Sequence, residues 1–423
     1  MAIPPLTAAF LVLLAASLAV RTWLAQRQIL HVRRHRDDVP AAFIAHIDVA
    51  AHRRTADYTI ARVHVEQVEI VVDTLALLVL TLGGGVAALA RATGALALPP
   101  LVQDLALAAA VVVVGGAIAL PFSWWRTFGV ETRFGFNRCT RKRWAADVAG
   151  LAAVTAVLGA PLTAVMLWLM RDGRPAWWLA AWVVWVAFEI ALAVLYPALI
   201  APLFNRFTPL PPGALRERVE GLLARCRFGA TRLFIADGSR RSSHANAWFA
   251  GLGRSRRVVL FDTLLAQLSP DEVEAVLAHE IGHDRLHHVV KRIAWSAAVS
   301  LAGLALLAAA MRAPWFVTAL GVPAAEVPAI GARPGVTLVL FLLVLPAFTF
   351  MFAPLASAWS RRHEFEADAF AAEHASAPAL AAALTRLYAS NASTLTPDPL
   401  YAAFHDSHPS ASERVARIAE ASA

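Results

Sequence analysis

The sequence predicts a polytopic membrane protein dominated by α-helices, with a small β-element in its polar part. Hydrophobic residues make up 58% of the 423 residues, charged residues only 16%, and the mean hydropathy is +0.57. A soluble protein usually carries about 25% charged and 45–50% apolar residues. Apolar runs long enough to cross a bilayer recur along the chain, and it has only two cysteines. These observations exclude a disordered or disulfide-rich secreted protein and argue against a purely soluble enzyme.

Seven apolar segments are the predicted membrane spans, because each approaches or exceeds the ~20 residues that cross a bilayer as a helix. The first is interpreted as a retained anchor and not as a cleaved signal, since no Lys or Arg precedes it and arginines such as Arg21 and Arg27 follow it. The segments lie near 5–25, 68–90, 101–121, 147–170, 176–200, 293–311 and 336–358.

The basic residues predict the orientation of these spans. Segments 21–66 and 126–143 are rich in arginine, whereas the loop 312–335 holds few cations. With seven spans, every arginine-rich loop falls on one side, which the positive-inside rule makes cytoplasmic. The same alternation puts the polar segments 202–292 and 359–423 on that side. The net charge of +8 is therefore assigned to membrane flanks and not to nucleic-acid binding.

This topology divides the chain into four parts. Residues 1–201 hold the first five spans, 202–292 form a polar region, 293–358 hold the last two spans and 359–423 form a polar C-terminal region. Among the basic residues only Lys142 and Lys291 are lysines, whereas arginine and alanine abound. Such a composition is typical of GC-rich bacterial genomes and predicts a bacterial inner membrane.

Four acidic residues lie within or at the ends of the spans: Asp73, Asp104, Asp147 and Glu189. One interpretation is that they sit near the interfaces or pair inside the helix bundle. The other is that they line a water-filled interior, since a charge at membrane depth is costly anywhere else. The glycines 83–85 and 115–116 permit either close helix approach or bends.

The polar region 202–292 shows helix and strand signals. A helix is expected over 213–227, followed by short strands at 231–236 and 257–261. Another helix is expected to begin at Ser269, a suitable N-cap, because Pro270 follows at the first helical position and acidic residues occupy the first turn.

This last helix carries the pattern H-E-x-x-H at His279, Glu280 and His283. On a helix the two histidines lie one turn apart on one face, so both imidazoles can bind one Zn²⁺, and Glu280 beside them can take a proton from the attacking water. The alternative is a solvated helix face, against which the apolar residues 276–278 argue. His287 and His288 extend the pattern and are expected to be solvated, so they are not counted as ligands.

A catalytic zinc site needs a third protein ligand, and the candidates follow the last span. Segment 360–370 continues that span as a helix, and Glu364 and Asp368 share one face of it, with small alanines at 367 and 371 for close packing. One carboxylate could bind the metal while the other orients a ligand histidine from behind. Position alone does not choose among Glu364, Glu366 and His363.

A final polar cluster lies at 405–409, followed by Arg414 in an amphipathic terminal helix. A histidine or arginine near a metal could stabilise the oxyanion that develops during peptide hydrolysis. A surface turn followed by an N-cap explains the same residues equally well.

With these motifs in view, the sequence resembles the type I CAAX prenyl proteases, integral-membrane zinc metalloendopeptidases related to the yeast a-factor-processing enzyme. The resemblance is collinear from about residue 130 onward and agrees with seven spans. Besides the zinc helix and the Glu364–Asp368 pair, it rests on Phe134–Asn137, Ile200–Leu210, Ser242–Trp248, Val259–Leu265 and Ser407–Pro409.

The resemblance implies an arrangement of the site and of the whole molecule. It implies Zn²⁺ bound by His279, His283 and Glu364, with Glu280 as general base and Asp368 in a supporting role behind the ligands. It places His408, and less directly Arg414, near the substrate oxyanion, and it assigns Asn246 and Ala247 to pairing with an extended peptide as an added strand. The spans would enclose an intramembrane chamber, and a zincin-like domain would face the cytoplasm.

Alternatives remain at this stage for function. The expected activity is hydrolysis of a peptide or prenylated peptide by a monomeric enzyme in the bilayer. A membrane quality-control protease of the heat-shock type shares the zinc helix but usually has fewer spans. An intramembrane protease of the site-2 type would hold the zinc motif inside an apolar span, whereas here charged residues flank it. A transporter or an inactive scaffold would leave His279, Glu280, His283 and Glu364 without a purpose.

Overall fold

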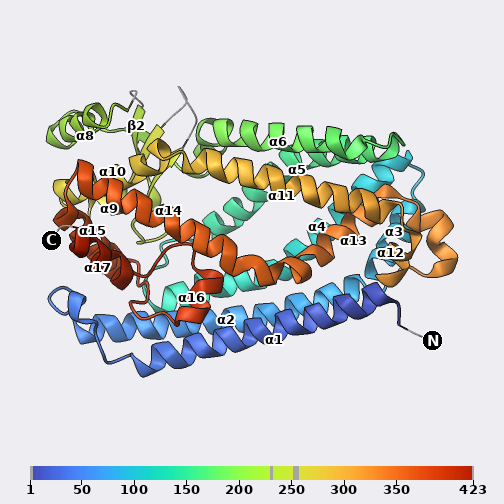
Figure 1. Ribbon diagram of the computed structural model, residues 1–423, viewed down its shortest axis with the longest axis horizontal. Helices are drawn as coiled ribbons and strands as arrows, with labels where there is room; N and C mark the ends of the chain where they lie inside the picture. Colours follow the sequence, from blue (N-terminus) through green and yellow to red (C-terminus); the bar gives the residue numbers. More distant parts are fainter. Residues whose placement is uncertain (1–2, 229–231, 251–256, 422–423) are drawn as a thin grey trace.

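The computed structural model of the chain describes residues 3–228, 232–250 and 257–421. Its long helices run side by side along one axis, with a polar part at one end and short helices at the other (Figure 1). The long helices and the short ones that cap them are α1 (Pro5–Arg34), α2 (Val49–Leu80), α3 (Gly85–Gly94), α4 (Pro100–Trp124), α5 (Arg141–Arg171), α6 (Trp177–Leu195), α11 (His288–Met311), α12 (Pro314–Ala319), α13 (Pro334–Thr349) and α14 (Ala353–His374).

The number of spans agrees with the prediction. Six helical segments of the described chain are long and apolar enough to cross a membrane, and the bent pair α2–α3 makes a seventh. Large apolar side chains on these segments are exposed, with 68% exposure for Val113, 69% for Val157 and 58% for Val183. An apolar surface of this extent on parallel helices requires lipid around it. The protein is therefore an integral, multi-pass membrane protein.

The glycines at 83–85 produce a bend. The axes of α2 and α3 differ by 53°, and Gly84 between them has the left-handed backbone conformation, with φ of 74°, which glycine adopts without strain. A Cβ atom at Gly83 would lie 2.7 Å from the backbone oxygen of Val79, so a side chain there would also clash. The glycines at 115 and 116 have open space beside them and mediate no close helix contact.

The acidic residues of the spans mostly have partners inside the bundle. Asp104 is fully buried and pairs with Arg171 and with Arg333, whose Nε lies 2.8 Å from the carboxylate. Asp147 accepts two hydrogen bonds from Arg241, at 2.8 and 2.9 Å. Glu189 accepts hydrogen bonds from the Ser296 hydroxyl and the Trp185 indole. For these residues the pairing interpretation is confirmed.

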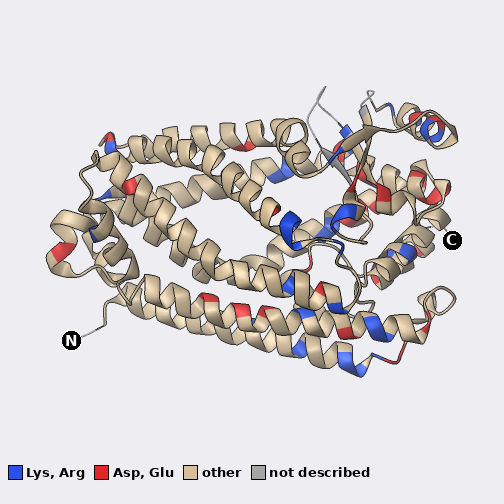
Figure 2. Cartoon of the chain, turned by 180° about the vertical axis from the view of Figure 1, so that it is seen from behind, with Lys and Arg blue, Asp and Glu red and all other residues tan. Residues whose placement is uncertain are grey.

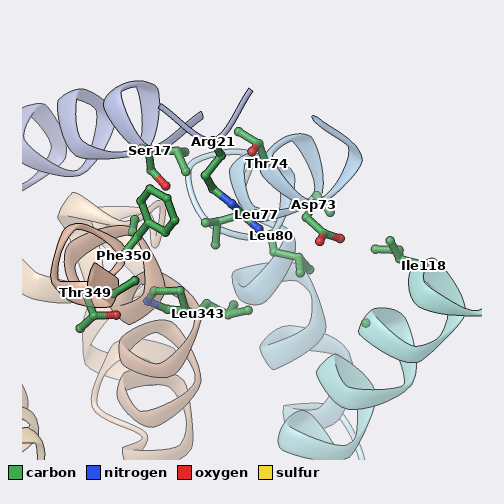
Figure 3. A pocket seen from close by; sticks show the side chains of 16 residues that line it. Ser17, Arg21, Asp73, Thr74, Leu77, Leu80, Ile118, Leu343, Thr349 and Phe350 are labelled. Carbon is green, nitrogen blue, oxygen red and sulfur yellow. The ribbon is translucent and has the colours of Figure 1, made fainter. Parts of the chain in front are cut away.

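Asp73 instead lines a cavity of about 550 Å³ among α1, α2, α4 and α13. Figure 3 shows the Arg21 side chain reaching into this cavity from α1, with Asp73 on the neighbouring helix α2 and Leu343 and Phe350 on the opposite wall. The walls of the cavity are largely apolar, and Arg21 and Asp73 are the charged residues that line it. Asp73 thus faces a cavity, and the water that the second interpretation places there stays a prediction.

The polar part lies at the end of the bundle that carries most of the charged residues (Figure 2). Its small sheet has the strand order β1-β2-β4-β3, with β2 and β4 parallel and both outer strands antiparallel to their neighbours. The elements of this part are α7 (Ala201–Phe204), α8 (Ala214–Arg225), α9 (Asp262–Leu265), α10 (Pro270–Arg285), α15 (Ala377–Ser390), α16 (Pro399–His405), α17 (Ala411–Ala421), β1 (Phe207–Pro209), β2 (Arg232–Ala236), β3 (Ala247–Ala250) and β4 (Arg257–Phe261).

Most predicted elements of this part form as expected. Helix α8 and strands β2 and β4 match the predicted segments 213–227, 231–236 and 257–261, although residue 231 lies outside the described residues. Strands β1 and β3 were not predicted. The sheet packs with α8, α10, α15 and α17 around one apolar core that includes Leu222, Leu260 and Leu277. The proposed four-part division of the chain stays a prediction.

The C-terminal region is tied back to the first span by one buried carboxylate. Asp398, the N-cap of α16, pairs with Arg27 of α1 at 2.9 Å. The backbone N–H of Asp398 also donates to the Gln28 side chain at 2.6 Å. Residues 370 and 371 positions apart in sequence are thereby held together, and this anchors the residues that follow α16 near the polar end of the bundle.

We expect the buried Asp104 pair to stabilise the far end of the bundle. Replacing Asp104 with Ala leaves Arg171 and Arg333 without their carboxylate, which should cost about 3–5 kcal/mol and lower the midpoint of thermal unfolding in detergent. The matched control is Asp172→Ala, because Asp172 pairs with the exposed Arg174 and should change stability by less than about 1 kcal/mol. Equal effects of the two substitutions would contradict this account.

Candidate metal centre

Helix α10 begins as predicted and buries most of its first three turns. The Ser269 hydroxyl accepts from the N–H of Glu272, and the Glu272 carboxylate accepts from the N–H of Ser269 at 2.8 Å, which forms a complete capping box. The apolar residues before the motif are buried, with Leu277 at 2% and Ala278 at 0% exposure. The helix is therefore packed in the core, and the alternative of a solvated face is wrong.

His279, His283 and Glu364 meet at one point. The two Nε2 atoms of the histidines lie 3.2 Å apart, and the Glu364 carboxylate of α14 lies 3.3 Å from His283 and 3.5 Å from His279. One donor atom from each of the three residues lies within 4.8 Å of the others. The structure thus brings together all three predicted ligands.

Small residues allow α14 to approach α10 closely enough for this contact. A Cβ atom at Gly282 would lie 3.2 Å from the Cα of Ala367 and equally close to the Cβ of Phe370. Ala367 and Ala371 are completely buried in the helix contact. The predicted role of the alanines in close packing is therefore confirmed, and Gly282 contributes the matching surface on α10.

Asp368 and Arg414 form a support behind His279. The Nδ1 atom of His279 lies 2.9 Å from Asp368, and Arg414 donates two hydrogen bonds to the Asp368 carboxylate, at 2.6 and 2.8 Å. Arg414 is buried and lies 3.8 Å from Glu364. Its guanidinium is thus directed mainly at Asp368, and the geometry gives it a positioning role more readily than a direct contact with substrate.

These charges alter the protonation of His279. Burial lowers the pKa of the imidazole, but hydrogen bonds to Asp368 and Glu364 outweigh burial and raise the pKa to about 9. A protonated imidazole cannot bind a metal, so metal binding must displace the proton. Metal affinity is therefore expected to fall as the pH decreases.

Glu280 lies beside the ligands on α10 without a fixed partner. Its carboxylate makes no hydrogen bond or ion pair with another side chain among the residues described. Burial raises the pKa of Glu280, and the nearby His279 and His283 oppose this effect in part. A carboxylate with a raised pKa takes a proton more readily, as a general base must.

His408 sits on a loop that faces the Glu364 carboxylate. Its Nδ1 lies 2.7 Å from Glu364, yet 63% of the side chain is exposed, so it can also contact another molecule. The loop is held from two sides: Arg361 donates to the backbone oxygen of Asp406 at 2.9 Å, and the Tyr388 hydroxyl donates to that of Pro409 at 3.0 Å. The roles of Arg361 and Tyr388 in holding this loop could not be recognised from the sequence of residues 407–409.

Asn246 and Ala247 lie at the start of β3, which is an edge strand of the sheet. The backbone oxygen of Asn246 accepts from Phe261 of β4. Because antiparallel strands alternate in the direction of their hydrogen bonds, the N–H and C=O of Ala247 face the edge of β3 that pairs with no other described strand. Asn391 was not predicted as a site residue. Its side chain exchanges two hydrogen bonds with the backbone of Ala245, the residue before Asn246, at 2.7 and 3.0 Å and so holds the start of this segment in place.

The expectation that His288 is solvated is wrong, although its neighbour His287 is exposed. His288 is 1% exposed and forms a second cluster with His363 and Glu366. Residue His287 has the left-handed conformation, with φ of 58°, which turns the chain between α10 and α11 so that His288 returns toward His283. Glu366 and His363, the other candidates for third ligand, thus lie away from the first ligand cluster.

The first cluster fits a metal cation. The Glu364 carboxylate is buried, and the Nε2 atoms of His279 and His283 face it from one helix at 3.5 and 3.3 Å. A carboxylate and two histidines are the ligands of catalytic zinc sites in peptidases such as thermolysin. Helices that cross a bilayer, together with this donor set at their polar end, define a membrane-embedded metallopeptidase.

Comparison with known proteins gives the family. Residues 28–206 match the family model described as "CAAX prenyl protease N-terminal, five membrane helices", and residues 209–422 match "Peptidase family M48". The chain belongs to the CAAX prenyl protease group of peptidase family M48 and is an integral-membrane metalloendopeptidase. The non-catalytic alternatives are therefore set aside, and the N-terminal match favours this group over the heat-shock type.

Individual relatives support the same conclusion. The chain is similar to the CAAX prenyl protease 1 homolog of Oryza sativa subsp. japonica, with 35% identity over 76% of this chain and 74% of the relative. It is 34% identical to CAAX prenyl protease 1 of Saccharomyces cerevisiae, over 71% and 68% of the two chains. The crystal structure of S. mikatae Ste24p superposes with a TM-score of 0.89 at 28% identity, covering 98% and 99% of the chains.

We expect the close contact at Gly282 to be required for metal binding. Gly282→Val adds a branched side chain against the backbone of Ala367, which should move α14 and Glu364 away and cost about 1–3 kcal/mol. The measurement is bound metal per chain after gel filtration, together with thermal unfolding. Gly221→Val in α8 is the control, because only the end of the Arg225 side chain lies near that position. Full metal content in the Gly282 variant would contradict the packing argument.

Proposed function

We propose that the chain is a zinc endopeptidase in which His279, His283 and Glu364 hold Zn²⁺ and Glu280 acts as general base. The observation that carries the proposal is the convergence of the three donor groups, within 4.8 Å, beside a carboxylate without a fixed partner. In metallopeptidases such as thermolysin, two histidines and one glutamate bind zinc. When bound, the ion supplies Lewis-acid chemistry, which makes water more acidic and the scissile carbonyl more electrophilic.

Each side chain around the proposed metal site has its own role in peptide hydrolysis. Glu280 takes the proton of the attacking water and returns it to the amine that leaves when the peptide bond breaks. His408, which is exposed and lies 2.7 Å from Glu364, donates a hydrogen bond to the oxyanion that develops on the carbonyl. Asp368 fixes the ring of His279, and Arg414 fixes Asp368.

The substrate binds as an added strand along the open edge of β3. The N–H and C=O of Ala247 provide the backbone pairing, and Asn246 lines a cavity of about 460 Å³ with Arg62, His244 and Asn391. Strand addition of this kind recognises the peptide backbone and leaves side-chain specificity to the neighbouring pockets. Helix α10 packs against β3, so a peptide on this edge lies close to the metal centre.

The substrate class and cellular position follow from the relatives and from the charge distribution. The relatives are named as CAAX prenyl proteases, and we assign to this chain the cleavage of C-terminal peptides from prenylated proteins or of similar lipid-bearing peptides. The basic residues gather at the polar end (Figure 2), which supports a cytoplasmic location of the site. The alanine- and arginine-rich, lysine-poor composition supports a bacterial inner membrane. We propose that the enzyme acts as a monomer.

The general-base role predicts the behaviour of Glu280→Gln. This variant keeps the size of the side chain but cannot accept the proton, so kcat should fall by about 10²–10⁴-fold while bound zinc stays at the wild-type amount. Peptide cleavage is measured with detergent-purified protein, with and without a chelator. Glu373→Gln, on an exposed carboxylate of α14, is the control. Substantial cleavage by the Glu280 variant would show that another group is the base.

The substrate proposal predicts a preference for prenylated peptides. A prenylated CAAX peptide should be cleaved in a chelator-sensitive way and faster than its unprenylated twin, because the lipid adds binding energy from the apolar part of the protein. The two peptides are compared by kcat/KM in the same detergent. Equal zinc-dependent cleavage of both would instead indicate general peptide turnover, and cleavage of neither by zinc-loaded protein would exclude this substrate class.

A further inference from the structure

We propose that His288 and Glu366 position His283, the second metal ligand, through a chain of hydrogen bonds that ends on α14. The proposal rests on the proposed function, because it takes His283 as a ligand through its Nε2 atom. It assigns a role to a buried histidine that lies outside the H-E-x-x-H motif, and it explains why Glu366 occupies the position between Glu364 and Asp368.

The distances allow one consistent arrangement of hydrogens. The Nδ1 atoms of His283 and His288 lie 2.9 Å apart, and Nε2 of His288 lies 3.1 Å from Glu366. A histidine that binds a metal through Nε2 carries its hydrogen on Nδ1 and must donate it. His288 Nδ1 is therefore the acceptor, so the hydrogen of His288 is on Nε2 and is donated to the Glu366 carboxylate.

The surroundings hold His288 in this orientation. Its ring is buried and stacks on the ring of His363, with 4.1 Å between the centroids. The Glu366 carboxylate is itself fixed, because Arg362 donates to it at 2.9 Å and Lys291 lies 3.9 Å from it. A carboxylate held in this way keeps the hydrogen bond from His288 directional, and His288 in turn fixes the ring of His283.

Both ligand histidines are thereby supported from α14, but by different routes. His279 contacts Asp368 directly, whereas His283 reaches Glu366 through the ring of His288. Metal-binding histidines usually donate their second N–H to a carboxylate, a backbone oxygen or water, and losing that partner lowers metal affinity or activity by about 10–100-fold. The same size of effect is expected for His288.

A second cation bound by His288, His363 and Glu366 is the competing explanation, since their donor atoms also lie within 4.8 Å of one another. Two observations and the proposed arrangement of hydrogens disfavour it. The two imidazole rings are nearly parallel, at 12°, so their lone pairs do not converge. Arg362 and Lys291 already neutralise Glu366. A cation on Nε2 of His288 would also place its hydrogen on Nδ1, facing the hydrogen of His283.

The test is zinc affinity, measured by competition with a chelator on detergent-purified full-length protein, together with the visible spectrum of the cobalt-substituted protein. His288→Phe keeps a stacked ring but removes the acceptor, and it should weaken zinc binding by about 10–100-fold and shift the cobalt bands. His288→Asn restores an acceptor near the Nδ1 position and should recover most of the affinity. Glu366→Ala should weaken binding measurably.

Matched controls separate this role from general destabilisation. His287→Asn changes the exposed neighbouring histidine to a residue that tolerates its left-handed conformation, and Glu373→Ala removes an exposed carboxylate from the same helix. Both should bind zinc and cobalt like the wild type. If His288→Phe does not fold, the positioning role is tested by comparing the zinc affinity and cobalt spectrum of Glu366→Ala with those of Glu373→Ala.

The outcomes are distinguishable from failure of the proposed function. A wild-type protein that binds no zinc contradicts the function itself. If the wild type binds zinc and His288→Phe has the same zinc affinity and cobalt spectrum, the positioning role alone is overturned. If His288→Phe does not fold, the same result in Glu366→Ala overturns it. Two tightly bound zinc ions in the wild type, one of them lost in His363→Phe, would overturn it in favour of a second metal site.

Discussion

The close packing of α10 against α14 is the constraint on which the site depends. Two proposed ligands lie on the first helix and the third on the second, and the Gly282–Ala367 contact brings their donor atoms within reach. Because both helices are rigid and continue into other elements, the separation of their axes determines the geometry of all three ligands at once. The supports Asp368 and Glu366 lie on the same rigid helix as the third ligand, so one helix contact positions the ligands together with the groups that orient them.

The same helices reconcile a hydrophobic protein with a charged active site. Helix α14 continues the last span into the polar part, and α11 runs from the metal helix back into the membrane. Charged groups accumulate where the helices leave the apolar region, and the intramembrane acids that remain are paired, as Asp104 is, or face a cavity, as Asp73 does. This arrangement avoids the cost of unpaired charges in lipid and keeps the metal centre attached to the membrane.

Local patterns were sufficient for part of this architecture. The spans follow from long apolar runs, the start of α10 from Ser269 and Pro270, and the pairing of His279 with His283 from their spacing of four residues. The choice of Glu364 over Glu366 and His363 depends on how α14 is rotated against α10, which no local pattern specifies, and it was made by resemblance to a family. His288 was misjudged because a left-handed turn at a histidine has no strong sequence signal. The tie between Asn391 and Ala245 joins residues 146 positions apart and could be seen only in three dimensions.

The position of Arg414 in the sequence has a consequence for biosynthesis. The proposed metal ligands come from α10 and α14, but the arginine that holds Asp368 comes from α17, after the last span. A ribosome that has completed every membrane span has therefore not yet supplied all the groups of the site. The nascent chain therefore completes the hydrogen bonds that hold Asp368 only after its membrane segments have been synthesised.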